Sequence, residues 1–172
     1  MRFLLAVILF ATPLMAQSLD PRYEPVGNFD GDFGDTTLGL KSLFDTEKDR
    51  SAVKLRDASG FATLSVSASA IGDDGKPTSP SVSFTIGPIG AGGDEIRSDV
   101  FFADTTGYYI ADNDIGGRVG LSDYEQTETS VSFSVEALLQ PVKRGDDGFE
   151  VDDARAGKTI SGTFLGAFTD VD

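Results

Sequence analysis

The sequence predicts an all-β protein, namely an antiparallel two-sheet β-sandwich of about 8–9 strands that follows a cleavable signal peptide. Three observations lead to this prediction. Apolar and polar residues alternate with the period of a β-strand in many segments, turn-forming residues separate these segments, and helical periodicity is nearly absent. A closed β-barrel is the alternative, because alternation alone does not distinguish a barrel from a sandwich.

The N-terminal segment Met1–Ala16 reads MRFLLAVILFATPLMA and is typical of a signal peptide. Arg2 precedes a continuous apolar run, and Ala16 is a small residue of the kind found before a cleavage site. The run is shorter than the ~20 apolar residues that a membrane-spanning helix needs. We therefore expect cleavage after Ala16 and a single mature domain over residues 17–172, either periplasmic or secreted.

Four segments of the mature chain alternate most clearly, with Ser or Thr on one face and apolar side chains on the other. Successive side chains of a strand point to opposite faces, so each segment predicts a half-buried strand. The residues expected in the core are Ala62, Leu64, Val66, Ala68 and Ala70 of Phe61–Ala70; Val82, Phe84 and Ile86 of Ser81–Ile86; Val131, Phe133, Val135 and Ala137 of Ser130–Ala137; and Ile160, Phe164 and Phe168 of Thr159–Phe168. Gly162 and Gly166 lie between the last Phe residues, which predicts close approach of a neighbouring strand or ring.

Weaker alternation predicts further strands, and clusters of Asp, Asn, Gly and Pro provide the turns between them. The segment Asp45–Asp57 does not repeat apolar residues at helical spacing, so we expect a loop followed by a strand there. The further strands are expected at Thr37–Phe44, Ala52–Arg56, Ile96–Ala103, Gly107–Ala111 and Arg118–Ser122.

The charge balance excludes several classes of partner. The chain has 14 Lys and Arg but 28 Asp and Glu, a formal net charge of -14. Binding to nucleic acid or to anionic lipid relies on Lys and Arg, so neither is expected, nor is membrane insertion after signal cleavage. Strong net charge favours a soluble monomer. Cysteine is absent, so the core must be stable without disulfides.

The residue types also exclude most catalytic sites. Without His or Cys, the chain can build neither a Ser-His-Asp nor a Cys-His arrangement, nor the common zinc sites. Phosphate-binding and dinucleotide-binding glycine motifs are absent as well. Pairs of carboxylates remain, as in enzymes that cleave glycosidic bonds. With so many acidic residues such pairs occur by chance, so we expect a protein that is not an enzyme.

Two acidic segments are candidate calcium sites. Asp30, Asp32 and Asp35 lie within the segment NFDGDFGD, and Asp112 and Asp114 form part of DNDIGG. Hard cations prefer several oxygen ligands, which these residues supply. An EF-hand does not fit, since the sixth and twelfth positions lack the required Gly and Glu. Solvated turns use the same residues, and no other cofactor is expected.

Two pairs of adjacent aromatic residues, Phe101-Phe102 and Tyr108-Tyr109, lie in neighbouring predicted strands. Adjacent residues face opposite ways, so one residue of each pair belongs to the core and the other lies on the outer face. Two outward aromatic side chains lying side by side would form an exposed apolar patch, either for a ligand or partner or for packing under a loop.

The sequence thus predicts an exported acidic β-domain that acts as a non-enzymatic binding or structural interaction module, with an unknown protein or small-ligand partner. Two alternatives stay open. A closed barrel with an empty apolar lumen would indicate a carrier of small ligands. Two carboxylates facing each other across a cleft would indicate a glycan-processing enzyme.

Overall fold

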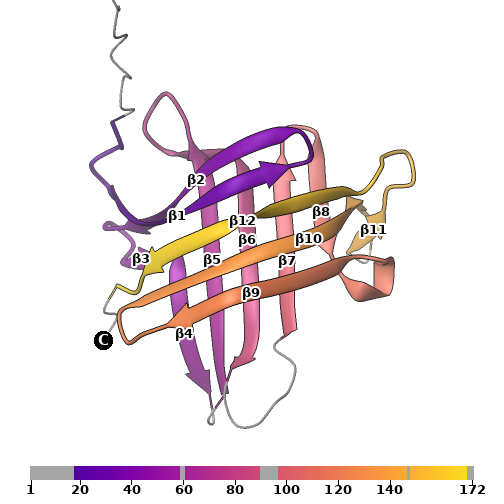
Figure 1. The fold of residues 1–172 in the computed structure, drawn as a ribbon. Helices are drawn as coiled ribbons and strands as arrows, with labels where there is room; N and C mark the ends of the chain where they lie inside the picture. Colours follow the sequence, from indigo (N-terminus) through magenta and orange to yellow (C-terminus); the bar gives the residue numbers. More distant parts are fainter. Residues whose placement is uncertain (1–17, 59–60, 90–96, 147, 170–172) are drawn as a thin grey trace, which may run out of the picture.

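The computed structural model describes residues 18–58, 61–89, 97–146 and 148–169, so the predicted signal peptide and its cleavage site lie outside the described residues (Figure 1). Within these ranges no helix has the length and hydropathy to cross a bilayer. The described elements are β1 (Tyr23–Phe33), β2 (Thr36–Asp45), β3 (Arg50–Ser51), β4 (Val53–Ala58), β5 (Phe61–Ile71), β6 (Pro77–Ile89), β7 (Arg97–Asp104), β8 (Gly107–Ala111), the 3₁₀ turn η1 (Asn113–Ile115), β9 (Arg118–Gln126), β10 (Ser130–Arg144), β11 (Phe149–Val151) and β12 (Lys158–Ala167).

The twelve strands of the described residues belong to one sheet, in which every pairing among them is antiparallel. Hydrogen-bonded neighbours follow the order β2-β1-β12-β10-β8-β7-β6-β5, and a pairing of β2 with β5 closes these eight strands into a ring. The all-β antiparallel prediction is therefore confirmed. The separate sheets of a two-sheet sandwich are not confirmed, because the strands form one continuous sheet.

The ring is flattened into two layers that cross at a steep angle (Figure 1). Strands β2, β1, β12, β10 and β9 run diagonally across the front, and β5, β6 and β7 run upright behind them. The layers join where β2 meets β5 and where β10 passes from β9 to β8. The inner surfaces of the two layers face each other, and the strands continue from one layer to the other around the corners.

Short polar contacts hold the corner between β2 and β5. The hydroxyl of Ser42, which is fully buried, donates to the carbonyl oxygen of Ser67 at 2.7 Å. Ala52, between β3 and β4, links the same strands, since its amide donates to Leu43 and its carbonyl accepts from Ser67, both at 2.9 Å. The chain from β3 to β4 therefore bridges the corner, where β2 and β5 share a single residue pairing.

The core fills the space between the two layers. Aromatic rings from the front strands meet rings from the back strands, with centroid distances of 3.9 Å for Phe33 and Phe102 and 5.3 Å for Phe133 and Phe84. Among the predicted core residues, Ala62, Ala70 and Phe168 are partly buried, and the others are at most 4% exposed: Leu64, Val66, Ala68, Val82, Phe84, Ile86, Val131, Phe133, Val135, Ala137, Ile160 and Phe164.

The predicted strands are all present, and most extend beyond their predicted bounds. Ile96, the predicted start of β7, lies outside the described residues. The predicted loop and strand at Asp45–Asp57 are confirmed as a turn followed by β3 and β4. Strands β1, β3 and β11 are additions that the sequence pattern did not predict. The acidic segment around Asp30 is thus part of a long strand, paired with β2 on one side and β12 on the other.

Candidate functional site

The two aromatic pairs divide between the two faces of the sheet, as the alternation predicts. Phe102 and Tyr109 are 1% and 2% exposed and belong to the core. Phe101 and Tyr108 face outward from the neighbouring strands β7 and β8, and their ring centroids are 5.6 Å apart. The outer face therefore carries a pair of aromatic side chains that the core does not use.

Phe149 of β11 adds a third ring to this pair. Its centroid lies 5.8 Å from that of Phe101 and 5.6 Å from that of Tyr108, so each ring contacts both others. Tyr108 is 41% exposed and Phe149 is 49% exposed. We refer to Phe101, Tyr108 and Phe149 as the aromatic cluster.

Aliphatic side chains surround the aromatic cluster. Val142 of β10 pairs with Tyr108 on one side and with Val151 on the other, so all three share the outer face. Val142 is only 2% exposed, although it lies outside the main core. Ile110 pairs with Phe101 on the same face. The aromatic cluster is thus surrounded by apolar side chains that do not belong to the main core.

The side chain of Arg155 fixes the strands beneath the cluster. Its guanidinium donates to the carboxylate of Asp152 at 2.7 Å and to the carbonyl oxygen of Val142 at 2.9 Å. Longer bonds reach the carbonyl oxygens of Tyr108 and Thr106, at 3.4 and 3.3 Å. One planar group therefore joins the start of β8, the end of β10 and the loop after β11.

Two neighbours of Arg155 are adapted to it. The hydrogen bond from Arg155 lowers the pKa of Asp152, so this carboxylate stays ionised beside the guanidinium. Gly107 has a φ of 142°, and a Cβ atom there would lie 2.7 Å from a guanidinium nitrogen of Arg155. Glycine at this position lets the side chain of Arg155 pass close to the start of β8.

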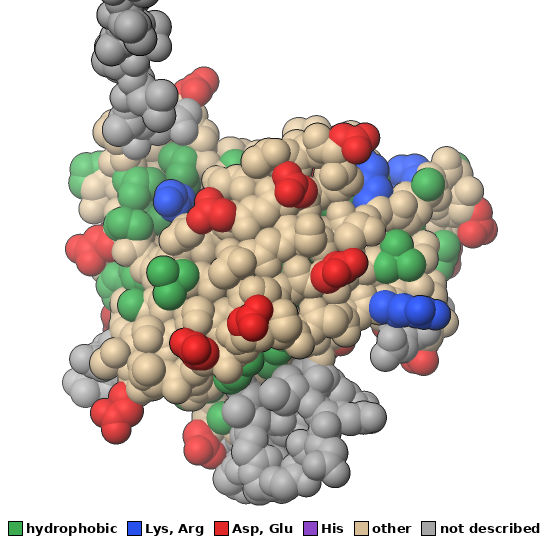
Figure 2. Space-filling view, viewed as in Figure 1, with side chains coloured by type: hydrophobic (Ala, Val, Ile, Leu, Met, Phe, Trp, Pro, Cys, Tyr) green, Lys and Arg blue, Asp and Glu red, His purple; other side chains and the backbone are tan. Residues whose placement is uncertain are grey.

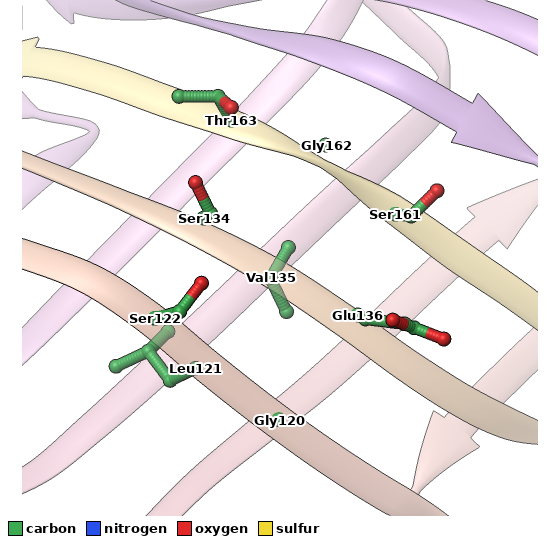
Figure 3. A pocket seen from close by; sticks show the side chains of 9 residues that line it. All are labelled: Gly120, Leu121, Ser122, Ser134, Val135, Glu136, Ser161, Gly162 and Thr163. Carbon is green, nitrogen blue, oxygen red and sulfur yellow. The ribbon is translucent and has the colours of Figure 1, made fainter.

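A second feature is a shallow depression on the outer face of β9, β10 and β12, with a volume of about 450 Å³. Small polar side chains line it, and Figure 3 shows Ser134, Thr163 and Glu136 projecting from neighbouring strands. Glu136 is the one carboxylate among its lining residues. The depression offers hydrogen bonds but neither an aromatic platform nor a second carboxylate.

The surrounding front face is polar. Figure 2 shows Asp and Glu side chains scattered over it among backbone and uncharged polar side chains, with several Lys and Arg side chains at the end near β11. The register places Asp30 opposite Thr163 and Asp32 opposite Ser161, so both carboxylates lie on the same outer face. This face has the character of a solvated surface.

The five predicted calcium ligands occupy two separate places in the fold. Asp30 and Asp32 lie in β1, and Asp35 lies in the turn after it. Asp32 accepts a hydrogen bond from Thr37 at 2.9 Å, and Asp30 accepts one from Asn28. Asp112 and Asp114 flank the start of η1, where the Asp112 carboxylate accepts from the amide of Asp114 at 2.8 Å. Among the described residues, no three acidic side chains come together as metal ligands would.

Two of the three cluster residues, Phe101 and Tyr108, belong to the aromatic pairs that the sequence indicated, and the third was not predicted. Phe149 follows the RGDDG turn and lies in a strand of three residues, too short to alternate. Arg155 was missed too, since a single Arg in a loop carries no pattern. The signal that could have indicated Phe149 is an isolated large apolar residue in an otherwise polar, acidic segment.

Comparison of this chain with known protein families, with curated proteins and with solved structures finds no match.

Proposed function

We propose that this chain is an exported, non-enzymatic binding module that holds its partner on the aromatic cluster. The observation that carries the proposal is the contact among Phe101, Tyr108 and Phe149 on the outer face, where two of the rings are more than two-fifths exposed. Exposed aromatic patches of this kind are typical of interaction sites.

The packed interior favours binding on the surface over binding inside the ring. Large side chains such as Phe29, Phe84 and Phe164 fill the space that a carried ligand would need.

The side chains on the surface favour binding over catalysis. The described depression offers the single carboxylate of Glu136, whereas glycosidases use two, and the chain has no His or Cys.

The construction of the cluster suits a binding site. Aromatic side chains dominate the energetics of many interfaces because they bury a large area and lose little rotamer freedom. Here the rings also pack against one another, and Arg155 donates hydrogen bonds to the backbones of both β8 and β10 beneath them. A partner would therefore meet a preformed surface, and little binding energy would be lost in ordering it.

Site-specific photo-crosslinking tests the proposal for a partner of any chemical class. The photoreactive residue p-benzoylphenylalanine replaces Ala103, which pairs with Tyr108 on the outer face, and the protein is exported by its own host. We expect an adduct of discrete mass after irradiation. The adduct should disappear when Tyr108→Ser and Phe149→Ser are added to the same chain.

The matched control places the photoreactive residue at Thr163, an exposed position in β12 on the front face. A partner held by the aromatic cluster should not be captured there. If the two positions give the same adducts, or if Ala103 gives none, the cluster is not the binding site.

A further inference from the structure

Strand β11 carries Phe149 of the aromatic cluster and is a free sheet edge in the described part of the chain. It pairs with β10 through Val142↔Val151, Lys143↔Glu150 and Arg144↔Phe149, and no other described strand pairs with it. A free edge is a place where a further strand can add to a sheet.

The hydrogen bonds at the two ends of β11 determine which backbone groups face this edge. The amide of Gly145 donates to the carbonyl oxygen of Gly148 at 2.7 Å, and the amide of Asp152 donates to that of Pro141 at 2.9 Å. Hydrogen-bonded and non-hydrogen-bonded pairs alternate in an antiparallel ladder. Glu150 therefore bonds to β10, and the N–H and C=O groups of Phe149 and Val151 point to the free edge.

The side chains of Phe149 and Val151 lie on the same face of the sheet as the aromatic cluster. Phe149 is one of its rings, and Val151 shares the outer face with Val142 and Tyr108. In a strand added beside β11, the residues opposite Phe149 and Val151 would lie on this face too. Main-chain bonds at the edge and side-chain contacts on the cluster would thus form together.

We propose that the partner held on the aromatic cluster is an extended polypeptide segment that adds to the free edge of β11 and places an apolar side chain against Phe149 and Tyr108. This inference rests on the function proposed above. Alternating N–H and C=O groups match a polypeptide backbone, which gives affinity, and the apolar surface selects side chains. A sugar chain has no such repeat of donors and acceptors.

The edge also limits which segments can bind. Strand β11 has three residues, so it offers bonds only to a short stretch of the partner. The net charge of the chain is -14, which opposes a strongly acidic segment at long range. We therefore expect a neutral or basic segment with an aliphatic or aromatic residue at its centre.

Selection from a phage-displayed library of random peptides tests the inference. The library is selected on the wild-type protein after depletion on the Tyr108→Ser/Phe149→Ser variant, and synthetic copies of the enriched peptides are titrated by calorimetry. We expect enriched sequences with a central apolar residue, and loss of binding to the Phe149→Ser variant.

A proline at Val151 separates edge pairing from simple apolar contact. Val151→Pro removes the N–H that faces the free edge and leaves the bonds to β10 intact, and edge strands accept proline. We expect about tenfold weaker binding of the selected peptides, because a buried acceptor on the peptide would stay unpaired. Val151→Ala, the matched control, keeps the N–H and should weaken binding by less than about threefold.

The results distinguish this inference from the proposed function. If the peptides require Phe149 but bind Val151→Pro as tightly as Val151→Ala, strand addition is wrong and the binding surface stands. If no peptide is enriched while crosslinking at Ala103 captures a sugar chain, the polypeptide partner is wrong and the surface stands. If crosslinking at Ala103 captures nothing, the surface itself is wrong.

Discussion

The ring of Phe29 lies over Gly162 of the neighbouring strand β12, so closely that a Cβ atom on Gly162 would come within 2.7 Å of the ring's Cζ. Within β12 itself, the ring of Phe164 covers Gly166, where an added Cβ atom would lie 2.6 Å from the Cζ of Phe164. The backbones also approach each other, since a Cβ atom on Gly162 would lie 2.7 Å from the Cα of Gly31. Glycine at these positions makes room both for the rings and for the opposite strand.

This contact predicts that Gly162→Ala destabilises the protein by about 1–3 kcal/mol, because a methyl group in a filled space forces the backbone or the ring to move. Chemical denaturation followed by circular dichroism measures the loss. The matched control is Gly120→Ala in β9, where the added Cβ would lie 3.5 Å from the Glu136 carbonyl oxygen, an ordinary contact. That variant should stay within about 0.5 kcal/mol of wild type; a similar loss in both variants would contradict the steric argument.

A second prediction compares neighbouring residues on opposite faces of β10. Phe133 is 1% exposed and contacts the rings of Phe84 and Phe164, so Phe133→Ala should cost about 3–5 kcal/mol of unfolding free energy. Ser132 faces outward opposite Leu165, and Ser132→Ala should change stability by less than about 0.5 kcal/mol. Urea titration of both variants measures the difference, and equal effects would mean that the assigned faces are wrong.

The sequence allowed prediction of strands wherever alternation separates core from solvent. In Ser130–Ala137 every inward residue is apolar and every outward residue is polar, so the sequence indicates both the strand and its buried face. Strand β1 escaped prediction because its inward positions alternate Phe29 and Phe33 with glycine, and its outward residues are turn formers. The repeated pattern Gly-x-Phe-x-Gly was the available signal. It occurs in Gly27–Gly31 and again in Gly162–Gly166, and the register pairs the two segments.

Closure of the ring could not be predicted, because it depends on the corner at Lys41 and Ser69, far apart in the chain, which alternation does not encode. The same limit applies to the candidate site. Alternation predicted that one residue of each pair, Phe101-Phe102 and Tyr108-Tyr109, faces outward, and the structure identifies these residues as Phe101 and Tyr108. The position of Phe149 beside them depends on how the β10–β11 hairpin folds back. The position of Arg155 depends on the conformation of the loop after β11.

The ion pair between Arg22 and Asp45 predicts loss of stability in acid. Arg22 donates from Nε and Nη2 to the two carboxylate oxygens of Asp45, at 2.7 and 2.6 Å, and joins the start of β1 to the end of β2. This bond lowers the pKa of Asp45 from 3.8 to about 2. A carboxylate whose pKa is lower in the folded state stabilises the fold above its unfolded pKa, and this contribution disappears as pH falls through the folded value.

The melting temperature should therefore fall between about pH 4 and pH 2, with a smaller decrease in an Asp45→Asn variant, which lacks the titrating group. Asp152 shifts in the same direction through its bond from Arg155 and adds to the decrease in both proteins. Thermal unfolding followed by circular dichroism across this range measures the effect. Identical pH profiles for wild type and Asp45→Asn would exclude the ion pair as a cause of the fall in melting temperature.

Arg155 is expected to be the polar side chain on which the aromatic cluster depends. In Arg155→Lys, one ammonium group cannot reach the separated acceptors at Asp152, Val142 and Tyr108, so stability should fall by about 1–3 kcal/mol. The control Arg144→Lys changes an exposed side chain and should be neutral. Fluorine NMR of protein labelled with fluorotyrosine should show a broadened Tyr108 signal in Arg155→Lys alone; an unchanged signal there would mean that Arg155 does not position the cluster.

The last prediction concerns calcium at the acidic segments. Asp30, Asp32 and Asp112 already accept hydrogen bonds from neighbouring groups, and no third acidic side chain joins them in the described residues. We therefore expect NaCl to raise the melting temperature by screening the net charge of -14, and CaCl₂ at matched ionic strength to do no more. A true site would add about 2.7 kcal/mol at a hundredfold excess of calcium over Kd. Melting curves in NaCl, MgCl₂ and CaCl₂ decide between the two: a calcium-specific rise that disappears in Asp30→Asn/Asp32→Asn would establish a site in β1, and one that disappears in Asp112→Asn would place it at η1.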